Sequence, residues 1–199
     1  MTDQPARDDQ TEESYLERMH AAKAHAVAWT GVIYRAASPR YARSGDLISG
    51  LGAMKVPGRW HPKGSFRVVY GAIEPEAAFA ESLAMHRYYQ LPFHLAMPKV
   101  VAAVRVELSS VLDLTNSQVR RRLGYFIPVL TELDWRQADA AGQVPLTRQL
   151  GIAAHAAGLE ALLVPSAAMR SARNLVIFPD NLLPTSRLVA VGLDEAGAG

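Results

Sequence analysis

The 199-residue chain contains no cysteine, which excludes disulfides, thiolate zinc sites and thiol catalysis. It also lacks any apolar run close to the roughly 20 residues that cross a bilayer. Its N-terminus is acidic and polar, whereas a signal peptide is basic and then apolar. We therefore expect a cytoplasmic protein with no membrane anchor and no membrane partner.

The composition, with 49% hydrophobic and 20% charged residues, is typical of one ordinary globular domain. A domain of this length buries roughly two thirds of its unfolded surface, so it needs no disulfide or structural metal to stay folded. The net charge of +2 hides an asymmetry, because residues 1–18 carry −4 and the rest of the chain +6. A basic body permits an anionic ligand, such as a phosphate compound or nucleic acid, without requiring one.

Both ends of the chain lack the apolar residues that a core requires. Residues 1–13 are predicted to form a disordered acidic tail, and residues 194–199 a flexible C-terminus. No internal repeat or linker interrupts the sequence between them. Residues 14–193 are therefore predicted to form a single compact domain.

Helices and strands intermix in the predicted domain without a steady βαβ rhythm. Helices are expected at 14–29, 74–89, 117–123 and 146–157, and strands at 32–35, 68–70, 100–108, 111–114, 160–165, 174–178 and 187–191. Residues 38–66 show no sustained period and are predicted to form a long, loop-rich segment, a kind that is often functional. The pattern indicates an α+β domain with a mixed or antiparallel sheet core flanked by helices. No glycine-rich dinucleotide motif or phosphate-loop lysine occurs, so neither common nucleotide fold is indicated.

Glu81 is the most informative single residue. At 100° per residue it lies on the same side of its predicted helix as four apolar residues, Ala77, Ala78, Ala84 and Met85. Burial of an unpaired carboxylate is costly, so Glu81 is expected either to pair with a base or to serve chemistry in a cleft. The sequence leaves both alternatives open.

Two arginines present a similar choice. Arg35 ends a short apolar strand, where a guanidinium either pairs with a buried acid or holds a phosphate through two donors. Arg59 lies in Gly58-Arg59-Trp60-His61, where it could hold an anion beside a flat ring. The alternative for Arg59 is a loop that its tryptophan simply anchors to the core.

Tyr70 and Ser166 lie at the ends of predicted strands. Tyr70 could hydrogen-bond a buried acid or stack on a ligand ring, although a core tyrosine is the commoner case. Ser166 follows Pro165 and could orient a ligand or cap a turn; no Gly-x-Ser-x-Gly elbow marks it as a nucleophile. The six histidines show no metal-ligand spacing, so no metal site is predicted. Arg120–Arg122 are predicted to form a solvated helix face, with a nucleic-acid patch as the alternative.

Taken in order, Arg35, Tyr70, Glu81 and Ser166 resemble the RES domain family, which is named for its Arg, Glu and Ser. The resemblance covers about residues 31–182 and rests on these motifs: Tyr34-Arg35, Gly58-Arg59-Trp60-His61, Val68-Val69-Tyr70, Asp113-Leu114-Thr115, Trp135, Pro145-Leu146-Thr147-Arg148, Val164-Pro165-Ser166 and Asn174-Leu175-Val176-Ile177-Phe178. The sequence departs from the family pattern at Pro57, where a glycine is usual, and at Val164, where an aromatic residue is frequent.

The resemblance implies a fold similar to ADP-ribosyltransferases and an activity on NAD+. It implies a bacterial toxin of a type II toxin–antitoxin system that depletes cellular NAD+ by cleaving the nicotinamide–ribose bond, through hydrolysis or phosphorolysis. The alternatives are an ADP-ribosyltransferase that modifies a host protein, an RNA-acting toxin and a non-catalytic binding module. The implied partner is an Xre-type antitoxin that blocks the NAD+ cleft, and we expect a homodimer without direct nucleic-acid binding.

The resemblance also implies a role for each site residue. Glu81 would hold the nicotinamide ribose, because a carboxylate stabilises an oxocarbenium-like state. Arg35 and Arg59 would bind phosphates or the adjoining ribose, Tyr70 would stack on nicotinamide, and Ser166 would hydrogen-bond the ribose or carboxamide. NAD+ is expected as a substrate, inorganic phosphate is considered as a co-substrate, and no resident cofactor is expected. Nicotinamide leaves as a neutral molecule, so no histidine acid is required.

Overall fold

The computed structural model describes residues 12–191. Most of the predicted acidic tail and the predicted C-terminal segment 194–199 lie outside the described residues. Helix α1 (Glu12–Lys23) begins within the predicted tail and ends six residues before the predicted end at residue 29. The helix prediction for residues 27–29 was wrong, because these residues pair with a neighbouring strand instead.

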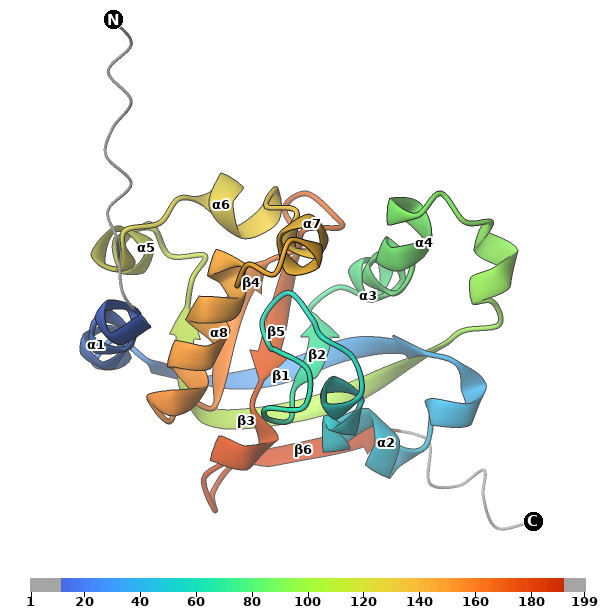
Figure 1. Cartoon of the computed structure of the whole chain (residues 1–199). Helices are drawn as coiled ribbons and strands as arrows, with labels where there is room; N and C mark the ends of the chain where they lie inside the picture. The colour runs from blue at the N-terminus through green and yellow to red at the C-terminus, as the bar shows by residue number, and fades with distance from the viewer. Residues whose placement is uncertain (1–11, 192–199) are drawn as a thin grey trace, which may run out of the picture.

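Six strands form the sheet core, with the bounds β1 (Val27–Ala37), β2 (Val69–Ala72), β3 (Val100–Asp113), β4 (Ala161–Pro165), β5 (Arg173–Ile177) and β6 (Arg187–Val191). Their order is β1-β2-β5-β4-β3-β6, and β1 also pairs with β3, so five strands close into a ring (Figure 1). Only β3 and β4 are parallel. The predicted α+β domain with a mixed sheet is therefore confirmed.

The two strands predicted at 100–108 and 111–114 form one strand, β3. It stays continuous because one edge pairs with β1 over most of its length, while the other edge pairs first with β6 and then with β4. At the opposite side of the ring, β1 and β2 are joined by a single pair of partners, Tyr34 and Ala72.

The helices after α1 are short, with the bounds α2 (Ser44–Ser49), α3 (Pro75–Ser82), α4 (Ala84–Tyr88), α5 (Ser117–Leu123), α6 (Ile127–Thr131), α7 (Trp135–Ala140) and α8 (Leu146–Ala156). Short 3₁₀ turns lie at η1 (Pro39–Tyr41), η2 (Leu51–Met54), η3 (Phe93–Ala96) and η4 (Pro179–Asn181). The helix predicted at 74–89 is two helices that meet at Leu83, and the predicted loop 38–66 contains α2 with two of the turns. Among the described residues no helix is long and apolar enough to cross a membrane.

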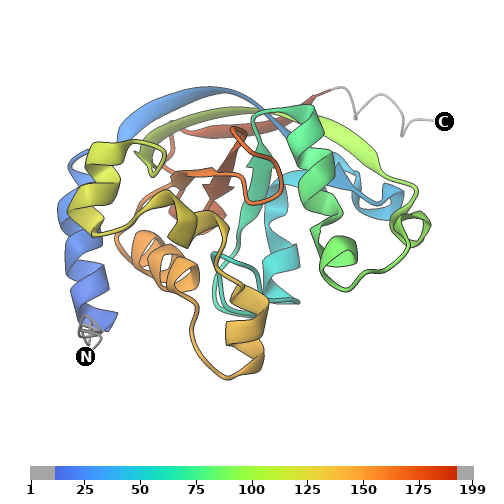
Figure 2. The ribbon, with the colours of Figure 1, turned by 90° about the horizontal axis from the view of Figure 1, so that it is seen from above.

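Both faces of the central strands are buried. Neighbouring residues of a strand point to opposite faces, so Leu162 packs in a cluster with the helices while Leu163 packs in a second cluster formed by the strands. Figure 2 shows α3 and α4 on one side of the strand ends and α6 and α7 on the other. The site lies between these two helical pairs.

Candidate active site

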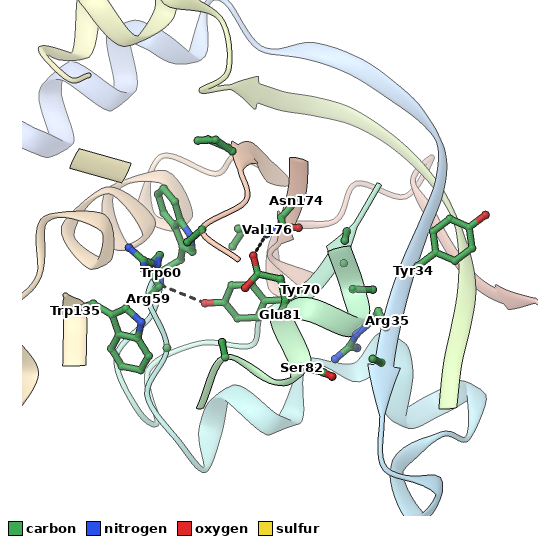
Figure 3. Close-up of a pocket in the computed structure, with 18 of the residues that line it drawn as sticks. Tyr34, Arg35, Arg59, Trp60, Tyr70, Glu81, Ser82, Trp135, Asn174 and Val176 are labelled. Carbon is green, nitrogen blue, oxygen red and sulfur yellow. Dashed lines mark hydrogen bonds between the residues drawn. The ribbon is translucent and has the colours of Figure 1, made fainter. Parts of the chain in front are cut away.

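A cavity of about 340 Å³ opens between α3 on one side and α7 on the other, above β1, β2 and β5. Its size suits part of a small-molecule ligand. The predicted residues Arg35, Arg59, Tyr70 and Glu81 all line it (Figure 3). The fifth predicted residue, Ser166, lies behind the lining and contacts Glu81.

Glu81 lies in the last turn of α3, a helix that begins with Pro75 at its first position. Its Oε1 accepts hydrogen bonds from Ser166 Oγ at 2.6 Å and from Asn174 Nδ2 at 2.7 Å. No described residue donates to Oε2 or forms an ion pair with the carboxylate. The side chain is half-buried, so one oxygen is held by the protein and the other is available to a ligand.

The expectation that Met85 shares the buried side with Glu81 was wrong, because Met85 is 50% exposed. The helix breaks at Leu83, and α4 does not continue the face of α3. The apolar neighbours Ala77 and Ala78 are buried as predicted. The surroundings of Glu81 therefore come from α3 and the strands, without a contribution from Met85.

Ser166 follows the end of β4, and its side chain is fully engaged. Its Oγ accepts hydrogen bonds from the backbone N–H groups of Ala168 and Met169, both at 3.2 Å. The single hydroxyl proton then goes to Glu81. Because Ser166 is only 6% exposed, it orients the carboxylate from beneath the cavity floor.

Asn174 on β5 is the second residue that fixes Glu81. A carboxylate only accepts, so the amide nitrogen of Asn174 must face it. The amide oxygen is buried and has no hydrogen-bond partner within the described part of the chain. An unsatisfied buried polar atom is uncommon and favours a functional role for the residue that carries it.

Tyr70 on β2 is held by a chain of hydrogen bonds through His61. The His61 Nε2 lies 3.1 Å from the carbonyl of Val56, which can only accept, so Nε2 carries the hydrogen and Nδ1 is an acceptor. The Tyr70 hydroxyl donates to that Nδ1 at 2.8 Å and accepts from the Trp60 N–H at 3.3 Å. The hydroxyl is thus occupied, and Tyr70 offers the cavity its ring.

Burial governs the ionisation of this hydrogen-bonded chain. It raises the pKa of Tyr70 well above its ordinary value, because the phenolate would be desolvated. Burial also lowers the pKa of His61, and the hydrogen bond to Val56 offsets this only in part. Both groups are therefore neutral near pH 7, as the hydrogen-bond directions require.

Arg35 on β1 points into the cavity and donates a hydrogen bond to the carbonyl of Leu47. Burial lowers its pKa to about 10, which still leaves the guanidinium charged at neutral pH. No described carboxylate pairs with it. The first of the two alternatives for Arg35, a buried acid partner, is therefore not found among the described residues.

Arg59 faces the cavity from the loop after η2. Its Nη1 donates to the carbonyls of Leu130 at 3.2 Å and Leu133 at 3.1 Å. Burial is the largest influence and lowers its pKa, while the carboxylate of Glu81 raises it and the like charge of Arg136 lowers it. Arg59 therefore lies within electrostatic reach of both Glu81 and Arg136.

The loop that carries Arg59 is fixed by Arg148 on α8. The Arg148 guanidinium donates to the carbonyl of Gly58 at 3.2 and 3.3 Å and forms an ion pair with Asp139 on α7. A Cβ on Gly58 would lie 2.7 Å from His61 Nδ1 and 2.8 Å from the Tyr70 hydroxyl. Only glycine fits there without separating these two residues.

Arg136 and the loop contact of Arg148 were not predicted from the sequence, and Trp135 and Asn174 entered only as parts of motifs. All except Arg148 line the cavity. Arg120, in contrast, does not form the predicted solvated face, because its Nη1 donates to the carbonyls of Leu114 and Thr115. Within residues 12–191 no group of three or more histidine or acidic residues could hold a metal ion.

Comparison with known proteins gives three findings. A family model of the RES domain matches residues 32–193, close to the range of the sequence resemblance. Proteins named NAD(+) phosphorylase MbcT from Mycobacterium bovis and Mycobacterium tuberculosis are 27% identical over 169 residues, which cover 82% of this chain and 86% of theirs. The M. tuberculosis MbcT–MbcA toxin–antitoxin complex contains a chain with the same fold, at a TM-score of 0.66, 22% identity and coverage of 93% and 91%.

Proposed function

The chain belongs to the RES domain family, and we propose that it is the toxin of a toxin–antitoxin pair that depletes NAD+ by cleaving the nicotinamide–ribose bond. The observation that carries this proposal is the cavity itself. The carboxylate of Glu81 is held by two donors, Ser166 and Asn174. Arginines line the same cavity and form no ion pair with a described carboxylate. The similarity to proteins named NAD(+) phosphorylase supports the same substrate.

Glu81 is the group that we assign to the reacting ribose. Loss of nicotinamide leaves positive charge on the ribose carbon, and a fixed carboxylate stabilises that charge. Ser166 and Asn174 hold Oε1, which directs Oε2 toward the cavity and a ribose hydroxyl. The electron pair of the broken bond passes to the nicotinamide ring, which becomes neutral, so the step needs no acid.

The remaining residues bind and orient the substrate. Arg35 stays charged inside the cavity and suits the diphosphate of NAD+. Tyr70 presents a ring whose hydroxyl is already bonded, which suits stacking on nicotinamide. For Ser166 we replace the expected contact with ribose or carboxamide by a positioning role, because its only proton is donated to Glu81.

We further propose that an antitoxin, expected from the resemblance to be of the Xre type, restrains the enzyme by covering the cavity. The solved relative with the same fold is described as a toxin–antitoxin complex, which supports such a partner. A homodimer, a cytoplasmic location and the absence of nucleic-acid binding belong to the same proposal. It includes no metal and no resident cofactor; NAD+ is consumed as a substrate.

The proposal is tested by following NAD+ and nicotinamide by NMR with purified protein. Wild-type protein is expected to release nicotinamide, and Glu81→Gln to lose at least about 100-fold in rate, because a neutral amide cannot stabilise the developing charge. Glu107→Gln, at an exposed position on β3, is the matched control. Undiminished turnover by folded Glu81→Gln would remove its central role, and transfer of label from NAD+ onto protein would favour the ADP-ribosyltransferase alternative.

A further inference from the structure

The segment that links α4 to β3 carries an unusual number of exposed apolar side chains. Residues 85–97, which we call the apolar arm, include seven large apolar residues that are 40–62% exposed: Met85, Tyr88, Tyr89, Leu91, Phe93, Leu95 and Met97. Within the arm only His86 and Ala96 are buried. Figure 1 shows the arm at the edge of the molecule opposite α1.

The exposed apolar surface of the arm is larger than a monomer usually carries. With about 200 Å² for a fully exposed large apolar residue, the seven exposed fractions leave roughly 700 Å² open to solvent. The largest apolar patch of a typical monomer covers about 300–600 Å² and often has a function. A specific protein interface buries about 800 Å² on each partner, so the arm supplies most of one side of such an interface.

The backbone of the arm is held in place although its side chains are uncovered. The Leu91 N–H donates to the carbonyl of His86 at 2.8 Å, which closes α4. Gln90, with a φ of 53°, donates its N–H to the carbonyl of Arg87 at 3.3 Å and turns the chain. The 3₁₀ turn η3 then orders the second half of the arm. A surface fixed in this way loses little conformational freedom when it binds a partner.

The charge on and around the arm is of one sign. No acidic residue occurs between Glu81 and Glu107, whereas Arg87, Lys99 and Arg105 lie in that interval. Two copies of the chain that met through their arms would bring like charges together, which disfavours association. The charge pattern therefore favours a partner whose apolar residues are flanked by carboxylates.

The chain's own ends have too little apolar surface to cover the arm. Each of the ranges outside the described residues, 1–11 and 192–199, contains a single large apolar residue, Met1 or Leu193. An apolar surface is removed from water only by a comparable apolar area. The occupant of the arm is therefore a different protein.

The arm begins at the entrance of the cavity. Ser82 and Ala84, just before it, line the cavity. Tyr88 of the arm reaches α7, where its hydroxyl donates to Asp134 Oδ2 at 3.0 Å and its ring centre lies 5.0 Å from the guanidinium carbon of Arg136. Arg136 also lines the cavity. A protein seated on the arm therefore lies next to the entrance without filling the cavity.

We infer that the apolar arm is the surface on which the antitoxin docks, and that the antitoxin presents an acidic, amphipathic helix to it. This inference rests on the proposed antitoxin and adds the source of its affinity, which lies outside the NAD+ cavity. A helix places apolar residues in one stripe with charged residues beside it, which matches an apolar surface bordered by arginine and lysine. The arm holds the partner, and its position brings the partner to the cavity entrance.

The test first identifies the antitoxin as the gene product that restores growth to cells producing the chain. Calorimetry then measures its affinity for the purified chain. For Phe93→Ser and Leu95→Ser we expect binding at least about tenfold weaker, because a few anchor residues carry most of the affinity of an interface. NAD+ turnover by the two free variants should stay within about twofold of wild type, since neither residue lines the cavity. Phe126→Ser and Leu183→Ser, at exposed positions outside the arm, are the matched controls.

Charge reversal tests the acidity of the partner. Arg87→Glu combined with Lys99→Glu should slow association at least about fivefold at low salt, and about 0.5 M NaCl should remove most of the difference. The matched control is Arg121→Glu combined with Arg122→Glu, two exposed positions on α5.

Several results would overturn the inference. One is unchanged affinity for the antitoxin in folded Phe93→Ser and Leu95→Ser. Another is association that the charge reversal leaves unchanged or accelerates. A third comes from sedimentation of the chain alone: if Leu95→Ser converts a dimer into a monomer, the occupant of the arm is a second copy. The proposed function fails separately, through absence of NAD+ cleavage or of any gene product that restores growth.

Discussion

Removal of the Ser166 hydroxyl tests whether its hydrogen bond positions the carboxylate of Glu81 in the cavity. In Ser166→Ala, Glu81 Oε1 loses a donor at 2.6 Å and keeps only Asn174 at 2.7 Å. A hydrogen bond to a charged group contributes about 1.5–3 kcal/mol. If that contribution acts on the transition state, kcat falls roughly 10-fold to 150-fold, while the KM for NAD+ changes little because Ser166 does not line the cavity.

A double-mutant cycle with Asn174→Ala sharpens this test. Both residues donate to the same oxygen, so the combined loss should differ from the sum of the single losses by at least about 0.5 kcal/mol. Ser65→Ala, which removes an exposed hydroxyl bonded to the carbonyl of Pro62, is the control. The reasoning fails if folded Ser166→Ala keeps full kcat, or if its only defect is a higher KM for NAD+, since that would place the hydroxyl on the substrate.

Two further predictions concern stability and its pH dependence. Burial lowers the pKa of His61 below its ordinary value of 6.5. The stability that comes from the neutral ring is therefore present above pH 6.5 and is lost as the pH falls below it. Between pH 7.5 and pH 5.5 the melting temperature should fall less in His61→Gln than in wild type. For Glu160, burial acts to raise the pKa, but hydrogen bonds that include those from the backbone of Ser109, Ser110 and Leu183 outweigh it and lower the pKa. The stabilisation by the ionised carboxylate is present above the ordinary pKa of 4.5 and is lost below it. Glu160→Gln should therefore lower the free energy of unfolding in urea by roughly 2–3 kcal/mol at pH 7, and by less at pH 3. An equal loss at both pH values would contradict this account.

The sheet could be predicted from the sequence because its central strands are continuous apolar runs. Residues 161–164 are buried on both faces, and such runs are distinct even without a period. The short helices α6 and α7 were missed because five and six residues are too few to show a helical period. The end of α1 was misplaced because pairing with β3 overrides the helix-forming composition of the residues that follow it.

The site could be predicted in part. Arg35, Arg59, Tyr70 and Glu81 were found because charged or polar side chains beside apolar strands and helices are conspicuous in a sequence. Ser166 was also found, although with another role. Asn174, the second donor to Glu81, was not singled out, since it lies 93 residues away in the sequence and only the closed sheet brings it near. The placement of Arg59 and Arg136 in the same cavity likewise depends on how the loop around Arg59 packs against α7.

Of the seams in the five-stranded ring, the one between β1 and β2 has the fewest paired residues, with the single pair Tyr34 and Ala72. Both residues of this seam also line the cavity. A ligand that fills this part of the cavity would contact both β1 and β2. Such a ligand is therefore expected to add contacts between the two strands of the ring that share the fewest backbone pairs.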